Sequence, residues 1–77
     1  MEKIVLVGAG GHCKVIIDII KSECKYDIVG VTDRAYAPSV DGFVLDIPII
    51  GDYKVLEELY KFGVKNAFVC VGALQNI

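Results

Sequence analysis

The sequence Ile4-Val-Leu-Val-Gly8-Ala-Gly-Gly-His12-Cys-Lys14 joins a short aliphatic run to a glycine cluster and then to a helical pattern. The run at 4–7 is too short for a helix and too uniformly apolar for a strand with one wet face, so it predicts a parallel strand buried on both sides. Gly8 permits a tight turn, and Gly10 and Gly11 leave room for another molecule against the backbone. The next helix begins with unpaired N–H groups and the positive end of its dipole facing that space. Strand, turn and helix start together predict a site for an anion, most often a phosphate.

A helix and a second strand follow the glycine turn. Residues 12–22 carry apolar side chains at helical spacing, and residues 26–32 form an apolar segment that ends at Asp33. The helical pattern predicts a helix that packs against the sheet. Because a strand–helix–strand unit is right-handed, the two strands run parallel, and Asp33 reaches the edge that carries the glycine turn. The apolar residues of the helix are Val15, Ile16, Ile17, Ile19 and Ile20.

The rest of the chain predicts two further extended segments. Residues 35–46 are irregular, and residues 47–50 form a short extended segment. Pro48 lacks an N–H group, so this segment belongs at an edge of the sheet or next to a bend. A third buried parallel strand is expected at 66–71, and it stops at Gly72.

A second helix is expected between these two segments. Asp52 is a suitable N-cap for a helix at 53–62, which Gly63 ends. With the first helix, this element predicts an α/β fold, in which a short parallel β-sheet is flanked by helices in a small three-layer unit. The residues of the second helix that we expect to be buried are Val55, Leu56, Leu59 and Tyr60.

The composition describes one small globular domain, since the chain has 77 residues of which 55% are hydrophobic. A net charge of −2 without a basic cluster argues against nucleic acid as a partner. No apolar run has the length of a membrane span, and no secretory signal precedes the first strand, which favours a cytoplasmic protein without a membrane partner. Cys13, Cys24 and Cys70 lack a metal-ligand spacing, so we expect reduced thiols that serve as small core residues and no metal site.

The glycine cluster also fits part of the dinucleotide-binding fingerprint. Gly8-x-Gly10-x-x-Cys13 has the first two glycines of that pattern, and a small cysteine replaces the third. A tight turn that binds no ligand is the alternative interpretation of the cluster.

Three polar residues surround this turn. His12 is either a capping or solvated residue, or a donor to a phosphate or an acid–base group. Asp33 either accepts hydrogen bonds from a ribose or a base edge, or only shapes a turn. Arg34 either pairs with a phosphate or stays solvated. No residue is assigned a catalytic role.

Four motifs occur in order along essentially the whole chain: Val7-Gly-Ala-Gly-Gly-His12 with Lys14-Val15 and Asp18, Ile28-Val-Gly-Val-Thr-Asp33, Ile47-Pro-Ile-Ile-Gly51 and Val69-Cys-Val-Gly72. Their combination resembles the N-terminal domain of bacterial sugar acetyltransferases of the PglD and NeuD type, which belong to the left-handed β-helix acyltransferases. The Gly-Gly-His turn, the strand-end Asp and the Pro-x-x-Gly segment carry the resemblance.

This resemblance implies that residues 1–77 form a Rossmann-like domain that binds a nucleotide sugar, a UDP-sugar, as the acceptor of a sugar O- or N-acetyltransferase. By position, the glycine turn and its histidine would line the phosphates and sugar, and the strand-end pair would face the uracil or ribose. The substrate-binding residues that it implies are Gly10, Gly11, His12, Asp33, Arg34 and Gly72.

The resemblance also implies a C-terminal β-helix domain that is absent from these residues. That domain would form a homotrimer, carry the catalytic histidine and bind acetyl-CoA, the co-substrate of the full-length enzyme. We therefore expect the chain to be part of a longer protein and to transfer no acetyl group alone. The alternative is an NAD(H)- or CoA-binding Rossmann-type sensor or regulatory domain, and the sugar and the acylated position stay open.

Overall fold

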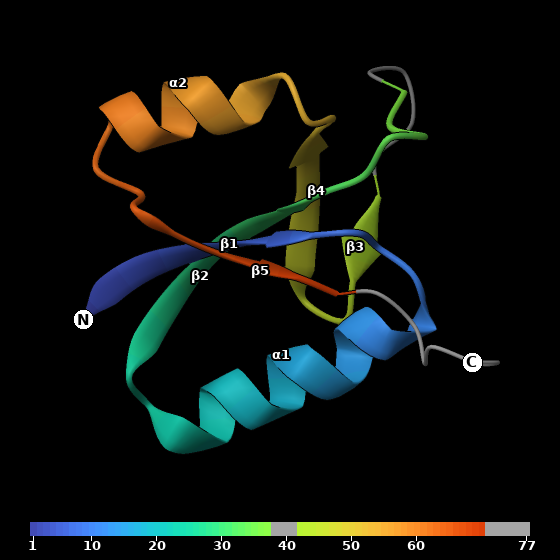
Figure 1. Cartoon of the computed structure of the whole chain (residues 1–77). Helices are drawn as coiled ribbons and strands as arrows, with labels where there is room; N and C mark the ends of the chain where they lie inside the picture. Colours follow the sequence, from blue (N-terminus) through green and yellow to red (C-terminus); the bar gives the residue numbers. More distant parts are fainter. Residues whose placement is uncertain (38–41, 71–77) are drawn as a thin grey trace, which may run out of the picture.

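The computed structural model describes residues 1–37 and 42–70, and these residues are arranged around one sheet. The two helices lie on opposite sides of that sheet, which gives the expected Rossmann-like α/β arrangement of three layers (Figure 1). The strand order is β3-β4-β2-β1-β5. The elements are β1 (Glu2–Val7), α1 (Gly11–Glu23), β2 (Tyr26–Thr32), β3 (Phe43–Val44), β4 (Ile47–Gly51), α2 (Val55–Lys61) and β5 (Asn66–Val69).

β1 is the buried parallel strand that its aliphatic run predicts. It pairs in parallel with β2 on one side and with β5 on the other. Val5 and Leu6 are 3% and 0% exposed. The register sets Val7 of β1 beside Thr32 of β2, so both strands end at the same edge of the sheet. The glycine turn and Asp33 leave the sheet from that edge.

α1 packs against the sheet along a narrower stripe than its sequence suggests. Its buried residues are Cys13, Ile16, Ile17 and Ile20, which recur at the spacing of one helix face. Val15 and Ile19 were expected to face the sheet, but they are 50% and 49% exposed because they lie beside this stripe. The helix starts at Gly11, one residue before the expected start at His12.

β4 is an internal strand, because the two-residue β3 pairs with it in antiparallel fashion on the side away from β2. The sheet is therefore mixed and not wholly parallel. Pro48 keeps its expected place next to a bend, since β4 begins directly after the turn at 45–46. Residues 38–41 of the stretch expected to be irregular lie outside the described residues.

α2 is shorter and more exposed than predicted. It starts at Val55 and not at 53, because Asp52 forms a local turn in which its Oδ1 accepts the N–H of Lys54 at 2.9 Å. None of its residues is buried, and Tyr60, which we expected in the core, is 62% exposed. Gly63 ends the helix as expected, with a left-handed φ of +99°.

β5 is parallel to β1, as predicted, but it is not buried. Within the described residues β1 is its one neighbour, so β5 lies at an edge of the sheet. Phe68 and Val69 are 46% and 57% exposed. The end of the strand that we expected, Val71, lies outside the described residues.

Candidate functional site

The turn between β1 and α1 depends on glycine at its first position. Gly8 has a φ of +104°, a conformation that residues with a side chain rarely adopt. A Cβ atom at this position would also lie 3.2 Å from the carbonyl oxygen of Cys70. The N–H of Gly8 donates to the carbonyl oxygen of Thr32 at 2.7 Å, which ties the turn to the end of β2. Gly8 is therefore explained by the fold itself.

Gly10 and Gly11 differ from Gly8, because the fold does not require glycine at either position. Gly10 has φ −74° and ψ −177°, which any residue can adopt. A Cβ atom at Gly10 or at Gly11 would meet no other atom within 4 Å, and both residues are exposed. The side of the turn that faces solvent is therefore open backbone.

The start of α1 faces this open space with N–H groups that have no acceptor in the part of the chain that the structure describes. Gly10 is the N-cap and has no side chain that could accept a hydrogen bond, while its carbonyl oxygen accepts the N–H of Cys13 at 3.0 Å. The N–H groups of Gly11 and His12 belong to the first turn, which has no acceptor within the helix. The first turn contains no acidic residue, so no carboxylate of the helix neutralises the positive end of its dipole. An exposed helix start of this kind can bind an anion.

Asp33 lies beside the turn, as the parallel pairing of β1 and β2 predicts. Its Oδ1 accepts the N–H of Ala9 at 3.2 Å, and its Oδ2 accepts the N–H of Ala35 at 3.2 Å. Its own N–H donates to the carbonyl oxygen of Gly51 in β4 at 2.9 Å. Asp33 also lines a hollow of about 170 Å³. The other residues that line this hollow are Ala35, Tyr36, Ala37, Gly42 and Ile49.

The structure brings together most of the residues expected at this site. His12 is the second residue of α1 and is exposed at the turn, and Arg34 is exposed directly after Asp33. Gly72 was expected to close the pocket, but it lies outside the described residues. The sequence does not predict the hydrogen bond from Ala9 to Asp33. Its donor is a backbone N–H, which every residue except proline carries, so the residue type at position 9 does not indicate the bond.

Two thiols lie beneath the turn. Cys13 and Cys70 are 0% and 5% exposed, and no disulfide joins the cysteines that the structure describes. Burial raises the pKa of the Cys13 thiol. Burial and the neighbouring Cys13 raise the pKa of the Cys70 thiol to about 12. Both thiols are therefore protonated at neutral pH and act as core residues, as expected. Cys24 is exposed at the end of α1, so the same expectation was wrong for it.

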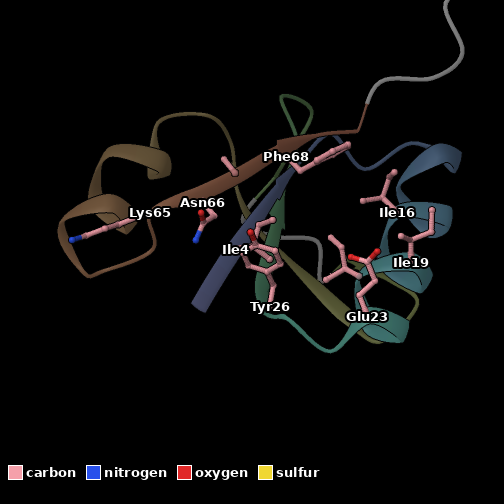
Figure 2. A pocket seen from close by; sticks show the side chains of 10 residues that line it. Ile4, Ile16, Ile19, Glu23, Tyr26, Lys65, Asn66 and Phe68 are labelled. Atoms are coloured by element: carbon pink, nitrogen blue, oxygen red, sulfur yellow. The ribbon is translucent and has the colours of Figure 1, made fainter. Parts of the chain in front are cut away.

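A larger hollow of about 550 Å³ lies on another part of the molecule, between α1 and β5 (Figure 2). Its wall is largely aliphatic and aromatic, with Ile16 and Ile19 from α1 and Phe68 from β5. It lacks the open helix start and the strand-end carboxylate that converge on the glycine turn. The turn is therefore the better candidate for a polar ligand.

The described residues contain no cluster of histidine, cysteine or acidic side chains that could bind a metal ion. Neither helix in that part of the chain is long and apolar enough to span a membrane.

Known proteins resemble this chain in fold and in sequence. No curated protein sequence matches the chain significantly. A crystal structure of a mutant perosamine N-acetyltransferase from Caulobacter crescentus, in complex with CoA and GDP-perosamine, matches it with a TM-score of 0.75 and 28% identity. The match covers 92% of this chain and 31% of that one, so this chain spans about a third of its relative. The family model of the PglD N-terminal domain matches residues 3–76. The chain therefore belongs to the PglD N-terminal domain family.

Proposed function

We propose that this chain binds the nucleotide-sugar acceptor of an acetyl-CoA-dependent sugar acetyltransferase. The observation that carries the proposal is the pair Gly10 and Gly11. Their backbone conformation and surroundings would accept a side chain, yet both positions are glycine. A ligand that lies against the backbone would explain why both residues are glycine, because a Cβ atom would occupy the space of the ligand. The family match supports a sugar nucleotide as that ligand, since the matched acetyltransferase was crystallised with GDP-perosamine.

The ligand is oriented by the charges around the turn. The diphosphate binds the N–H groups of Gly11 and His12 at the positive end of α1. The nucleoside extends toward Asp33 and Arg34, because a carboxylate repels phosphate but accepts hydrogen bonds from ribose or from a base N–H. His12, exposed at the same turn, donates to the phosphate or the sugar. We propose a UDP-sugar as the natural ligand, with a GDP-sugar as the competitor that the matched relative suggests.

The acetyl group comes from acetyl-CoA bound outside this domain. Acyl transfer requires a base, an oriented acceptor and a bound donor close together. This domain supplies the oriented acceptor. We propose that a C-terminal β-helix domain supplies the rest in a homotrimer, which is consistent with a relative whose chain is about three times as long as the matched part. The purified 77-residue chain should then show no acetyl-CoA-dependent turnover.

A panel of ligands tests the proposal. The chain is titrated with UDP, UDP-N-acetylglucosamine, a GDP-sugar, NAD and CoA, and binding is followed by amide chemical shifts. A nucleotide sugar should move the signals of residues 10–14. If the shifts appear around Tyr60 and leave 10–14 unchanged, the proposed site is wrong.

A pair of glycine variants separates ligand contact from folding. Gly11→Val places a branched side chain in the open space, so it should weaken nucleotide-sugar binding about tenfold or more, or by about 1.4 kcal/mol. The melting temperature should stay equal or rise, because valine has a higher helix propensity than glycine. Gly63→Ala is the matched control: its φ of +99° strains a side chain, so it should lower the melting temperature and leave binding unchanged. Unchanged binding by Gly11→Val would contradict the proposal.

A dinucleotide-binding sensor is the second candidate. It is favoured by the position of Asp33, at the end of the strand beside the glycine turn, where dinucleotide-binding folds bind a ribose. NAD binding tighter than that of any nucleotide sugar in the same panel would select this function.

A further inference from the structure

The glycine turn is tied to the end of β2 by two neighbouring N–H groups. The N–H of Gly8 donates to the backbone oxygen of Thr32, and the N–H of Ala9 donates to the side chain of Asp33. The first bond is available to any residue at position 32. The second bond requires a side chain at position 33 whose oxygen reaches the N–H of Ala9. A substitution at position 33 can therefore remove the second bond but not the first.

The carboxylate of Asp33 is itself held in place from two directions. Its second oxygen accepts the N–H of Ala35 in its own loop. Its backbone N–H is bound to Gly51, the last residue of β4. Asp33 is therefore hydrogen-bonded to β4, to its own loop and to the glycine turn, and these three bonds restrict its movement.

After Ala9, the next hydrogen bond that fixes the backbone lies at the start of α1, from the N–H of Cys13 to the carbonyl oxygen of Gly10. Gly10 and Gly11 carry no side chains, and a Cβ atom at either would have no neighbour within 4 Å. Glycine has the greatest backbone freedom of all residues. The two fixed points on either side are Ala9, bound to Asp33, and Cys13, buried in the core. Without the bond between Ala9 and Asp33, the N–H groups of Gly11 and His12 would be held less firmly in position.

We propose that Asp33 is a positioning residue that holds the N–H groups of Gly11 and His12 in their phosphate-binding arrangement through its bond to Ala9. The inference rests on the proposed function, and it adds a role to the contact with the nucleoside. A carboxylate has about four acceptor positions and the two backbone bonds use two, so both roles are compatible. The consequence is specific: at equal charge, loss of the bond between Asp33 and Ala9 must weaken the binding of phosphate groups that never touch Asp33.

The matched pair Asp33→Asn and Asp33→Ala tests this role. Both variants remove the negative charge, which by itself favours an anion at the turn. Asparagine keeps one acceptor oxygen for the N–H of Ala9 and places its NH2 group where the N–H of Ala35 had an acceptor, whereas alanine removes both acceptors. The difference between the two variants therefore isolates the bond to Ala9. Asp52→Ala is the control, since it removes a carboxylate that accepts a backbone N–H elsewhere in the chain.

Two measurements are made on each variant. Hydrogen exchange without ligand reports the amide of Ala9, whose N–H is bound to Asp33, and calorimetry reports affinity for inorganic pyrophosphate and for the nucleotide sugar. We expect Asp33→Ala to speed exchange at the amide of Ala9, which loses its acceptor, and to weaken pyrophosphate binding about tenfold relative to Asp33→Asn, which corresponds to the loss of one hydrogen bond between neutral groups. Asp33→Asn and Asp52→Ala should keep the wild-type exchange rate of the Ala9 amide.

The outcomes separate this inference from the proposed function. If Asp33→Ala binds the nucleotide sugar weakly but keeps wild-type exchange and pyrophosphate affinity, Asp33 contacts the nucleoside alone and the positioning role is wrong, while the proposed function stands. If the wild type binds neither ligand, the proposed function is wrong. Exchange at Ala9 in the unliganded variants then still decides whether Asp33 holds the turn.

Discussion

Gly30 offers a sharp test of how β2 and β4 fit together. It is buried in β2, where the side chain of Ile50 lies over it. A Cβ atom on Gly30 would lie 2.7 Å from Cγ2, 2.8 Å from Cδ1 and 3.0 Å from Cγ1 of Ile50. All three atoms belong to one half-buried side chain, so Gly30→Ala forces Ile50 to move and leaves the backbone in place.

The expected cost follows from these distances. Carbon atoms pack best at about 3.5–4.0 Å, so the new methyl group would intrude by about 1 Å. Overpacking of this kind costs about 1–3 kcal/mol. Alanine regains about 0.5–1 kcal/mol, because glycine inside a strand loses more backbone entropy on folding. We therefore expect Gly30→Ala to lower the free energy of unfolding by about 1–2 kcal/mol, out of about 4–12 kcal/mol for a chain of this size.

A double-mutant cycle with Ile50→Ala identifies the cause. The three clashing atoms are absent from alanine, so Gly30→Ala should be neutral or slightly stabilising in the Ile50→Ala background. The coupling energy between the two positions should be about 2 kcal/mol. Urea denaturation followed by far-UV circular dichroism gives the free energy of unfolding of all four proteins. An unchanged dependence of this free energy on urea concentration shows that the denatured state is unaffected. An equal cost of Gly30→Ala in both backgrounds would refute the reasoning.

Three further predictions concern the cysteines. Cys24 ends α1 with a left-handed φ of 55°, so Cys24→Gly should raise the free energy of unfolding by about 1 kcal/mol in thermal or urea denaturation; no gain would show that the thiol compensates for the strain. In the native protein, a thiol reagent should label exposed Cys24 quickly and buried Cys13 and Cys70 only after denaturation, and rapid labelling of all three would contradict the core described above. Burial raises the pKa of Cys70 from 9.0 to about 12, so the unfolded chain releases this proton at a lower pH than the folded chain. Stability should therefore fall as the pH rises from about 9 toward 12, and Cys70→Ala should show a smaller fall in the same urea titrations, whereas identical pH profiles would assign the fall to other groups.

The first half of the fold was predictable from the sequence because its signals are local. The aliphatic run, the glycines and the helical spacing after them specify β1, the turn and α1 within a few consecutive residues. The expected bounds of β2, 26–32, are those observed. The right-handedness of such units then brings Asp33 to the glycine turn without further information.

The second half was less predictable, because burial depends on neighbours that are distant in sequence. The segment of β5 reads as a buried strand, but its position at the edge of the sheet leaves Phe68 and Val69 exposed. The apolar spacing of α2 suggests a buried face, yet none of its residues is buried. An apolar pattern indicates which side chains could be buried. The packing of the other elements determines which of them are buried.

The site divides in the same way. A glycine turn, a helix start and a strand-end carboxylate can be placed at one edge of the sheet from the sequence, because chain order and handedness settle that placement. The distances in the folded chain are needed to see that Gly8 is required by the fold while Gly10 and Gly11 face open space. They are also needed to see that Asp33 accepts the N–H of Ala9. These distinctions depend on distances of a few ångströms between residues far apart in the chain, and residue types do not encode such distances.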